Sequence, residues 1–190
     1  MAKVYTLSLI LLTIALGAGP AGARGGRGVL LETMTWQQAE RVLTPEAVVV
    51  IPLGAAAKEH GPHLRLDNDW RIAEYLKRRV LARSAVVVAP TLPYHFYPAF
   101  VEYPGSTTLS FETARDVVVD ICRSMARHGP RRFYVLNTGV STRRPLADVR
   151  FDDLGLVAAR DILGHLLLRE LEPLAHLIVV EEVGVDRRVE

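Results

Sequence analysis

The sequence contains a single cysteine, Cys122, so no disulfide bond can form within the chain. It also lacks a marked excess of either charge, since 23 Lys and Arg residues stand against 21 Asp and Glu residues and the formal net charge is +2. So small a net charge gives no electrostatic basis for binding nucleic acid or an anionic membrane. We therefore expect no nucleic-acid partner. Cys122 falls in an apolar helical pattern, and we interpret it as a core residue.

The apolar run nearest the N-terminus, Val4–Leu16, has about 13 residues and falls short of the ~20 that span a bilayer. Lys3 precedes this run, and the small residues Ala21-Gly22-Ala23 follow it. The pattern is typical of a secretory signal peptide. We predict a signal peptide over residues 1–23, cleavage near Ala23 and Arg24, a secreted or periplasmic location and no stable membrane span after cleavage. An uncleaved anchor is the alternative.

After a flexible lead-in at 24–34, the pattern predicts a single α/β domain over 35–190. Short β-branched runs alternate with segments whose apolar residues recur at helical spacing. The expected strands are 47–53, 85–90, 133–137 and 176–180, and the expected helices are 36–43, 70–83, 111–128 and 154–171. Thr35 and Ser110 are the predicted N-caps of the first and third helices. This alternation favours a three-layer α/β/α fold with a mostly parallel sheet.

A short segment after the first predicted strand concentrates acids and imidazoles. Residues 59–69 contain Glu59, His60, His63, Asp67 and Asp69. Oxygen and nitrogen ligands of this kind suit a divalent ion such as zinc or manganese, and the carboxyl ends of strands are where open α/β sheets place their chemistry. The alternative is a solvated loop in which Asp69 caps the following helix.

The segment from residue 90 to 110 is rich in proline, glycine and aromatic residues. A loop of this length in a compact domain is usually functional. Its rings either form the wall of a pocket for a small planar substrate or cover the end of the sheet. His95, within this loop, either contacts a ligand or is solvated. Residues 138–142, after the third predicted strand, supply hydroxyl and amide groups for a substrate carbonyl or a bound water.

Three segments resemble the creatininase (creatinine amidohydrolase) family. The first carries Pro52, Gly54, the run His60-Gly61-Pro62-His63-Leu64 and Asp69 in the family's order. The second spans residues 97–110 and is similar to a Phe-Pro-Gly-Thr-x-Ser-Leu motif, and the third leads through strand 133–137 to a position where the family has Asn-Gly-His. The resemblance covers roughly residues 45–142.

The resemblance implies a metal-dependent hydrolase that cleaves a cyclic amide or another C–N bond of a small molecule through metal-activated water. It implies Glu59, His60 and Asp69 as ligands of zinc or manganese, with two ions in an intact member. Glu59 and His63 are the implied catalytic residues, His63 as ligand, partner of a ligand or proton shuttle. The implied substrate-binding residues are Tyr97, Tyr103, Ser106, Asn137 and Ser141. The family also suggests a homo-oligomer.

The sequence departs from the family pattern in three places. Lys58 stands where the family has a metal-binding Glu, and one extra residue separates Gly54 from His60, so that Glu59 takes this role only through a bulged backbone. Residues 137–142 carry no His or acid, and the family's later segment is missing. Two alternatives to the hydrolase therefore stay open: a catalytically impaired relative that binds a small molecule, and a truncated fragment of a longer enzyme.

Overall fold

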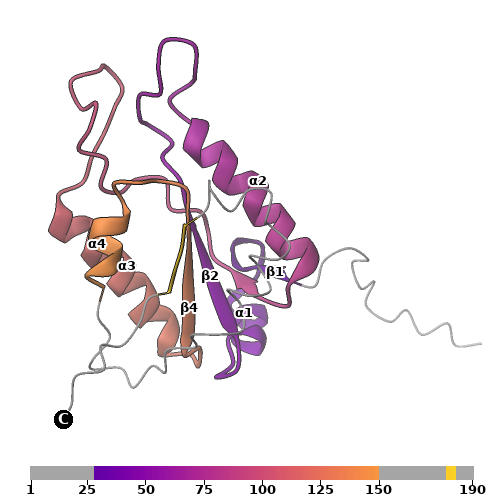
Figure 1. Cartoon of the computed structure of the whole chain (residues 1–190). Coiled ribbons are helices and arrows are strands. Elements are labelled where there is room, and N and C mark those ends of the chain that lie inside the picture. The colour runs from indigo at the N-terminus through magenta and orange to yellow at the C-terminus, as the bar shows by residue number, and fades with distance from the viewer. Residues whose placement is uncertain (1–27, 150–178, 183–190) are drawn as a thin grey trace, which may run out of the picture.

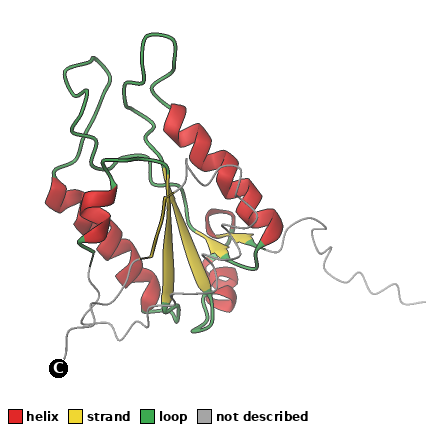
Figure 2. Cartoon of the chain, viewed as in Figure 1, coloured by secondary structure: helices red, strands yellow, loops and turns green. Residues whose placement is uncertain are grey.

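A computed structural model of the chain describes residues 28–149 and 179–182 (Figure 1). Within this part, ten short elements follow one another in an alternating order of strands and helices (Figure 2). The predicted signal peptide at 1–23 and the predicted helix at 154–171 lie outside the described residues. None of the helices in the described ranges is long and apolar enough to cross a membrane.

The strands of the described part form one sheet in the order β1-β3-β2-β4-β5. They are β1 (Val29–Leu30), β2 (Val48–Leu53), β3 (Val87–Val88), β4 (Arg132–Asn137) and β5 (Val179–Glu182). The central strand β2 pairs in parallel with β3 and, from Val48 to Leu53, with β4. The edge strand β5 runs antiparallel to β4. The predicted α/β class with a mostly parallel sheet is confirmed.

Local sequence signals fix where the helices begin and end. They are η1 (Leu31–Thr33), α1 (Trp36–Val42), α2 (Asn68–Arg83), α3 (Phe111–Ala126) and α4 (Arg143–Ala147). The hydroxyl of Thr35 accepts from the Gln38 amide, while the Gln38 side chain accepts from the Thr35 amide, which is the predicted capping box. Ser110 caps α3 through the Thr113 amide. Past its end, Gly129 has a φ of 135°, a value that favours glycine.

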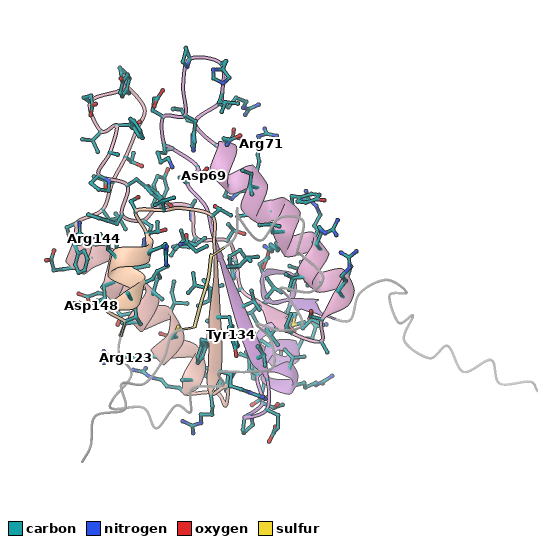
Figure 3. All side chains as sticks on the ribbon, in the orientation of Figure 1. Asp69, Arg71, Arg123, Tyr134, Arg144 and Asp148 are labelled. Carbon is teal, nitrogen blue, oxygen red and sulfur yellow. The ribbon has the colours of Figure 1, made fainter. Side chains whose placement is uncertain are left out.

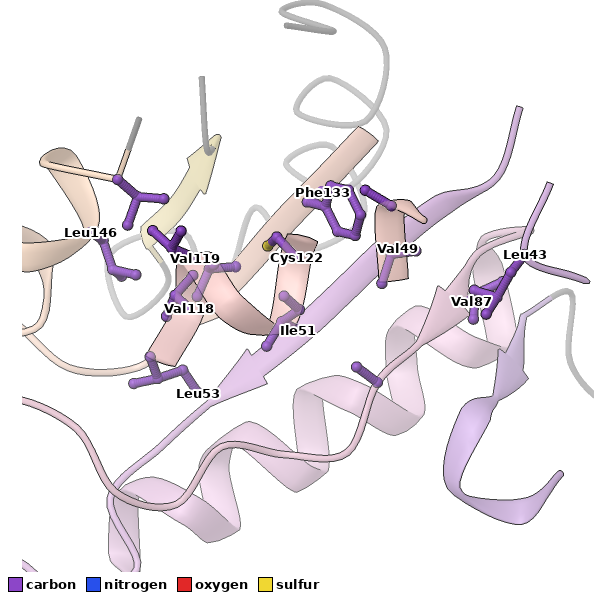
Figure 4. Close-up of a cluster of buried hydrophobic side chains, with 14 residues drawn as sticks. Leu43, Val49, Ile51, Leu53, Val87, Val118, Val119, Cys122, Phe133 and Leu146 are labelled. Carbon is purple, nitrogen blue, oxygen red and sulfur yellow. The ribbon is translucent and has the colours of Figure 1, made fainter. Parts of the chain in front are cut away.

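The two faces of the sheet bury separate hydrophobic clusters, as alternation along a strand requires. Val49, Ile51 and Leu53 of β2 pack with α3 on one face (Figure 4), and Val50 packs with α2 on the other. The Cys122 side chain is fully buried in the first cluster, and burial raises the pKa of its thiol to about 12. A thiol in that environment stays protonated, in agreement with its interpretation as core.

Three predicted boundaries differ from the structure. The lead-in at 24–34 contains β1 and η1, because Val29 and Leu30 pair with β3. The strand predicted at 85–90 is reduced to Val87–Val88. Of the strand predicted at 176–180, residues 176–178 lie outside the described residues, and the described part continues as β5 to Glu182. Two of these differences concern edge strands, whose pairing depends on a partner far away in the sequence.

Two loops extend from the carboxyl end of the parallel strands (Figure 1). We call them the first loop, residues 54–67 between β2 and α2, and the second loop, residues 89–110 between β3 and α3. They are joined by hydrogen bonds, since the Thr107 amide donates to Ala57 O at 3.0 Å and the Glu59 amide donates to Ser106 Oγ at 3.0 Å. The predicted site therefore lies between two loops that support each other.

Candidate functional site

A charged cluster forms where the first loop meets the start of α2. Lys58 Nζ donates to Asp69 Oδ2 at 2.8 Å, and His60 Nε2 lies 2.9 Å from Asp69 Oδ1. This second contact lacks the geometry of a hydrogen bond, and both ring nitrogens of His60 are buried without a partner among the described residues. The side chains of Lys58 and Asp69 are 17% and 11% exposed. We call these three residues the Lys58 cluster.

Asp69 is held in place by the packing of α2 against the end of β2. It lies in the first turn of α2 (Figure 3). The Trp70 amide donates to Ala55 O at 3.0 Å, and the Thr138 hydroxyl lies 3.2 Å from Asp69 O. A Cβ on Gly54 would lie 2.5 Å from Asp69 O. Because Gly54 has no side chain, the start of α2 can lie directly against the end of β2.

The structure brings together two of the three predicted metal ligands. His60 and Asp69 meet in the Lys58 cluster, whereas the Glu59 carboxylate accepts a hydrogen bond from the Gly61 amide. The turn at Gly61, with φ of 95°, offers its own amide to this carboxylate. The role of Glu59 as a metal ligand stays a prediction. His63, the predicted catalytic residue, is exposed at the tip of the first loop.

The side chains described at 28–149 do not fit a divalent metal ion. Zinc sites use three or four protein ligands, and no group of three His, Cys, Asp or Glu side chains that could hold a metal ion comes together within residues 28–149. Beside the two available donors stands a third group, the ammonium of Lys58, which carries a positive charge and has no lone pair to donate. The chemistry of this donor set is that of an internal ion pair.

Tyr97 forms a wall of the Lys58 cluster, as a pocket-lining residue would. Its side chain is 1% exposed, and Lys58 Nζ lies 5.8 Å from the centre of its ring. Burial first, and then the charge of Asp69, raise the pKa of the Tyr97 hydroxyl. That hydroxyl is buried with no hydrogen-bond partner among the residues described.

Two other predicted substrate-binding residues serve to hold the second loop. Ser106 accepts the Glu59 amide at 3.0 Å, and Ser141 donates to Phe96 O at 3.0 Å. Tyr103 is 47% exposed, with its ring 6.2 Å from that of Phe100. Of the aromatic residues in this loop, Tyr97 is therefore buried beside the cluster, whereas Phe100 and Tyr103 are exposed. His95, which is fully buried, is not a solvated residue.

Asn137, predicted to bind substrate, is fully buried at the end of β4. Its amide donates to Gly139 O at 2.8 Å, and its Oδ1 accepts from the Gly139 amide at 2.9 Å and from the Thr142 hydroxyl at 2.7 Å. All of these contacts lie within residues 137–142. Such local bonds are common for a short polar side chain at the end of a strand. A role of Asn137 in substrate binding stays a prediction.

Asn137→Ala is expected to lower the free energy of unfolding by about 2 kcal/mol, because the buried Gly139 amide and Thr142 hydroxyl lose their acceptor. Urea denaturation followed by circular dichroism measures this loss. The control is Ser141→Ala, which removes one partly buried hydrogen bond and is expected to cost less than about 1 kcal/mol. A stable Asn137→Ala variant with weakened ligand binding would instead restore the substrate-binding role.

In the sequence, Lys58 stands out only as a departure from a motif, and its partner is not apparent. The residue lies 11 positions before Asp69, and sequence spacing does not show that a loop returns over such a distance. The signal in the sequence was charge complementarity. Lys58 stands where the family has a glutamate, while Asp69 keeps its negative charge.

Comparison with known proteins places this geometry in a family. Residues 32–149 match the creatininase family model, described as creatinine amidohydrolase. A creatinine amidohydrolase of Pseudomonas putida is 32% identical over 117 residues, which are 58% of this chain and 45% of that protein. A mycofactocin precursor peptide peptidase of Mycobacterium tuberculosis is 32% identical over 109 residues, 50% of this chain and 43% of that protein.

A solved structure described as creatininase Mn superposes on the chain with a TM-score of 0.60 at 26% identity, and the match covers 84% of this chain and 58% of that one. The chain spans less than half the length of the Pseudomonas putida and Mycobacterium tuberculosis relatives. The family model covers well over half of this chain and includes the Lys58 cluster, both loops and β2 to β4. By its sequence and its fold, this chain belongs to the creatininase family, whose named relatives here are hydrolases.

Proposed function

We propose that this chain is an exported member of the creatininase family that binds a small polar molecule at the Lys58 cluster without metal-dependent hydrolysis. The observation that carries the proposal is the ion pair between Lys58 and Asp69, at 2.8 Å. The Lys58 ammonium lies where a divalent ion bound by His60 and Asp69 would have to lie. The export rests on the charged, apolar and small-residue pattern of residues 1–23.

Polar groups without partners support ligand binding at this position. The Tyr97 hydroxyl and His60 Nδ1 are buried and have no hydrogen-bond partner among the described residues. Buried polar groups are costly unless they are satisfied. A small molecule with hydrogen-bonding groups would satisfy them, while the ring of Tyr97 would cover one side of it.

The competing function is hydrolysis of a cyclic amide or another C–N bond with a divalent ion. Its support is the name of the matched solved structure, creatininase Mn, and the amidohydrolase and peptidase named among the relatives. Those names concern the relatives themselves. For this chain, hydrolysis needs ligands besides His60 and Asp69, from a longer protein or from residues beyond those described.

Thermal unfolding and turnover assays of the full chain distinguish the two functions. We expect creatinine, a hydantoin or a formamide to raise the midpoint of unfolding, with no turnover in the presence of Mn²⁺ or Zn²⁺ and no change after EDTA. His60→Ala, which removes a cluster side chain, is expected to abolish the stabilisation. Turnover that EDTA removes and Mn²⁺ restores would overturn the proposal and establish the hydrolase.

A further inference from the structure

We infer that Lys58 is a built-in counter-cation, which neutralises Asp69 in place of a divalent ion and keeps such ions out of the Lys58 cluster. The inference rests on the proposed metal-free function and names the residue that makes the site metal-free. Lys58 Nζ donates to Asp69 Oδ2 at 2.8 Å, and the other oxygen of the same carboxylate faces His60 Nε2 at 2.9 Å. Ammonium and imidazole thus share one carboxylate.

The geometry leaves no independent position for a second cation. An ion bound by both His60 and Asp69 would touch the Asp69 carboxylate and lie next to an ammonium already bound to it. The side chains of Lys58, His60 and Asp69 are 17%, 11% and 11% exposed, so water screens their charges weakly. The ion and the Lys58 ammonium would both contact the Asp69 carboxylate and would repel each other. The lysine side chain must therefore move away before the ion can bind.

The backbone that carries Lys58 is held between the two loops. Its own amide donates to Leu66 O at 3.1 Å, across the first loop. On either side of it, Ala57 O accepts the Thr107 amide and the Glu59 amide donates to Ser106 Oγ. The ring of Tyr97 lies 5.8 Å from the ammonium. These bonds fix the position of the Lys58 backbone at the junction of the two loops, from which its ammonium reaches Asp69.

The inference predicts that changing Lys58 creates a cation site. Lys58→Glu places a carboxylate beside His60 and Asp69, which makes a set of three donors of the type that binds Mn²⁺ or Zn²⁺. We expect this variant to bind Mn²⁺ at least tenfold more tightly than the unchanged chain, measured by isothermal titration calorimetry. Lys58→Met, which removes the ammonium and adds no ligand, is expected to have an affinity for Mn²⁺ between those of the unchanged chain and Lys58→Glu.

Matched controls separate the site from a general change of charge. Arg71→Glu alters the net charge equally and adds a carboxylate in the first turn of α2 (Figure 3). Arg71 forms an ion pair with Asp67 at 2.9 Å, away from the Lys58 cluster. It is expected to leave Mn²⁺ affinity unchanged. Adding His60→Ala to Lys58→Glu is expected to remove the gain. Near-ultraviolet circular dichroism confirms that each variant is folded.

The outcomes distinguish this inference from the proposed function. Folded Lys58→Glu and Lys58→Met variants that bind Mn²⁺ no more tightly than the unchanged chain would overturn the role of Lys58, even where no turnover is found. If Lys58→Glu does not fold, the comparison of Lys58→Met with the unchanged chain decides alone. Metal-dependent turnover by the unchanged chain would overturn the proposed function and the inference together, whereas the Lys58 variants test the inference alone.

Discussion

Gly54→Ala is expected to destabilise the fold by about 3 kcal/mol, because the added methyl group meets backbone. A Cβ at this position would lie 2.5 Å from Asp69 O and 2.8 Å from the Cβ of Ala73. Neither atom belongs to a flexible side chain, so α2 must move away from β2. Without this contact the substitution would stabilise the chain slightly, since alanine restricts the unfolded state more than glycine does.

Chemical denaturation of Gly54→Ala measures the loss, and Gly61→Ala provides the matched control. Gly61 has a φ of 95°, but its added Cβ would meet the exposed ring of His63 at 3.2 Å. That ring is free to turn, and the expected cost is the left-handed backbone alone, about 1 kcal/mol. Equal losses in the two variants would contradict the close approach of α2 to β2. The displacement of α2 also moves Asp69, so Gly54→Ala is expected to weaken ligand binding at the Lys58 cluster.

Acidification from pH 7 to pH 4 is expected to remove roughly 3 kcal/mol of stability through His95 alone. The His95 side chain is fully buried, and burial, opposed in part by the Ala114 backbone, lowers its pKa from 6.5 to about 4. Between these two values the unfolded chain binds a proton that the folded chain does not. The stabilisation is therefore complete above pH 6.5 and is lost as the pH falls towards 4.

The comparison of His95→Leu with the unchanged chain isolates this effect. Leucine fills much of the same space without a titrating group, so the variant's stability should fall less steeply between pH 6.5 and 4, whatever its stability at neutral pH. His128→Leu, at an exposed position, is the control and should keep the slope of the unchanged chain. Parallel slopes for His95→Leu and the unchanged chain would show that His95 is accessible to protons in the folded state.

Much of the scaffold was predictable, because burial and capping leave periodic traces in a sequence. The β-branched run at β2 and the apolar spacing of α3 report which side chains face the core. Thr35 and Ser110 report where helices begin, since a helix start needs an acceptor for its free amides. The same signals placed the acid-and-imidazole segment at the carboxyl end of the sheet, where the structure has it.

The pairing of side chains within the site was not predictable in the same way. Glu59 and Asn137 were assigned to a metal and to a substrate, yet each bonds to a backbone amide two residues further on. Such local bonds form readily because few additional residues must be fixed, so the loss of conformational entropy is small. The edge strand β1 was not predicted, because its pairing with β3 depends on residues far away in the sequence.

The sequence alone determined that this protein is an α/β domain of the creatininase family with charged groups after its first long strand. Periodicity, caps and motif order carry that information, since each depends on neighbours along the chain. Only the tertiary structure decided that a lysine, 11 residues before Asp69, would neutralise it. The physical reason is that an ion pair depends on where two loops cross, and that crossing is set by packing between α2 and β2 and by bonds between loops far apart in sequence.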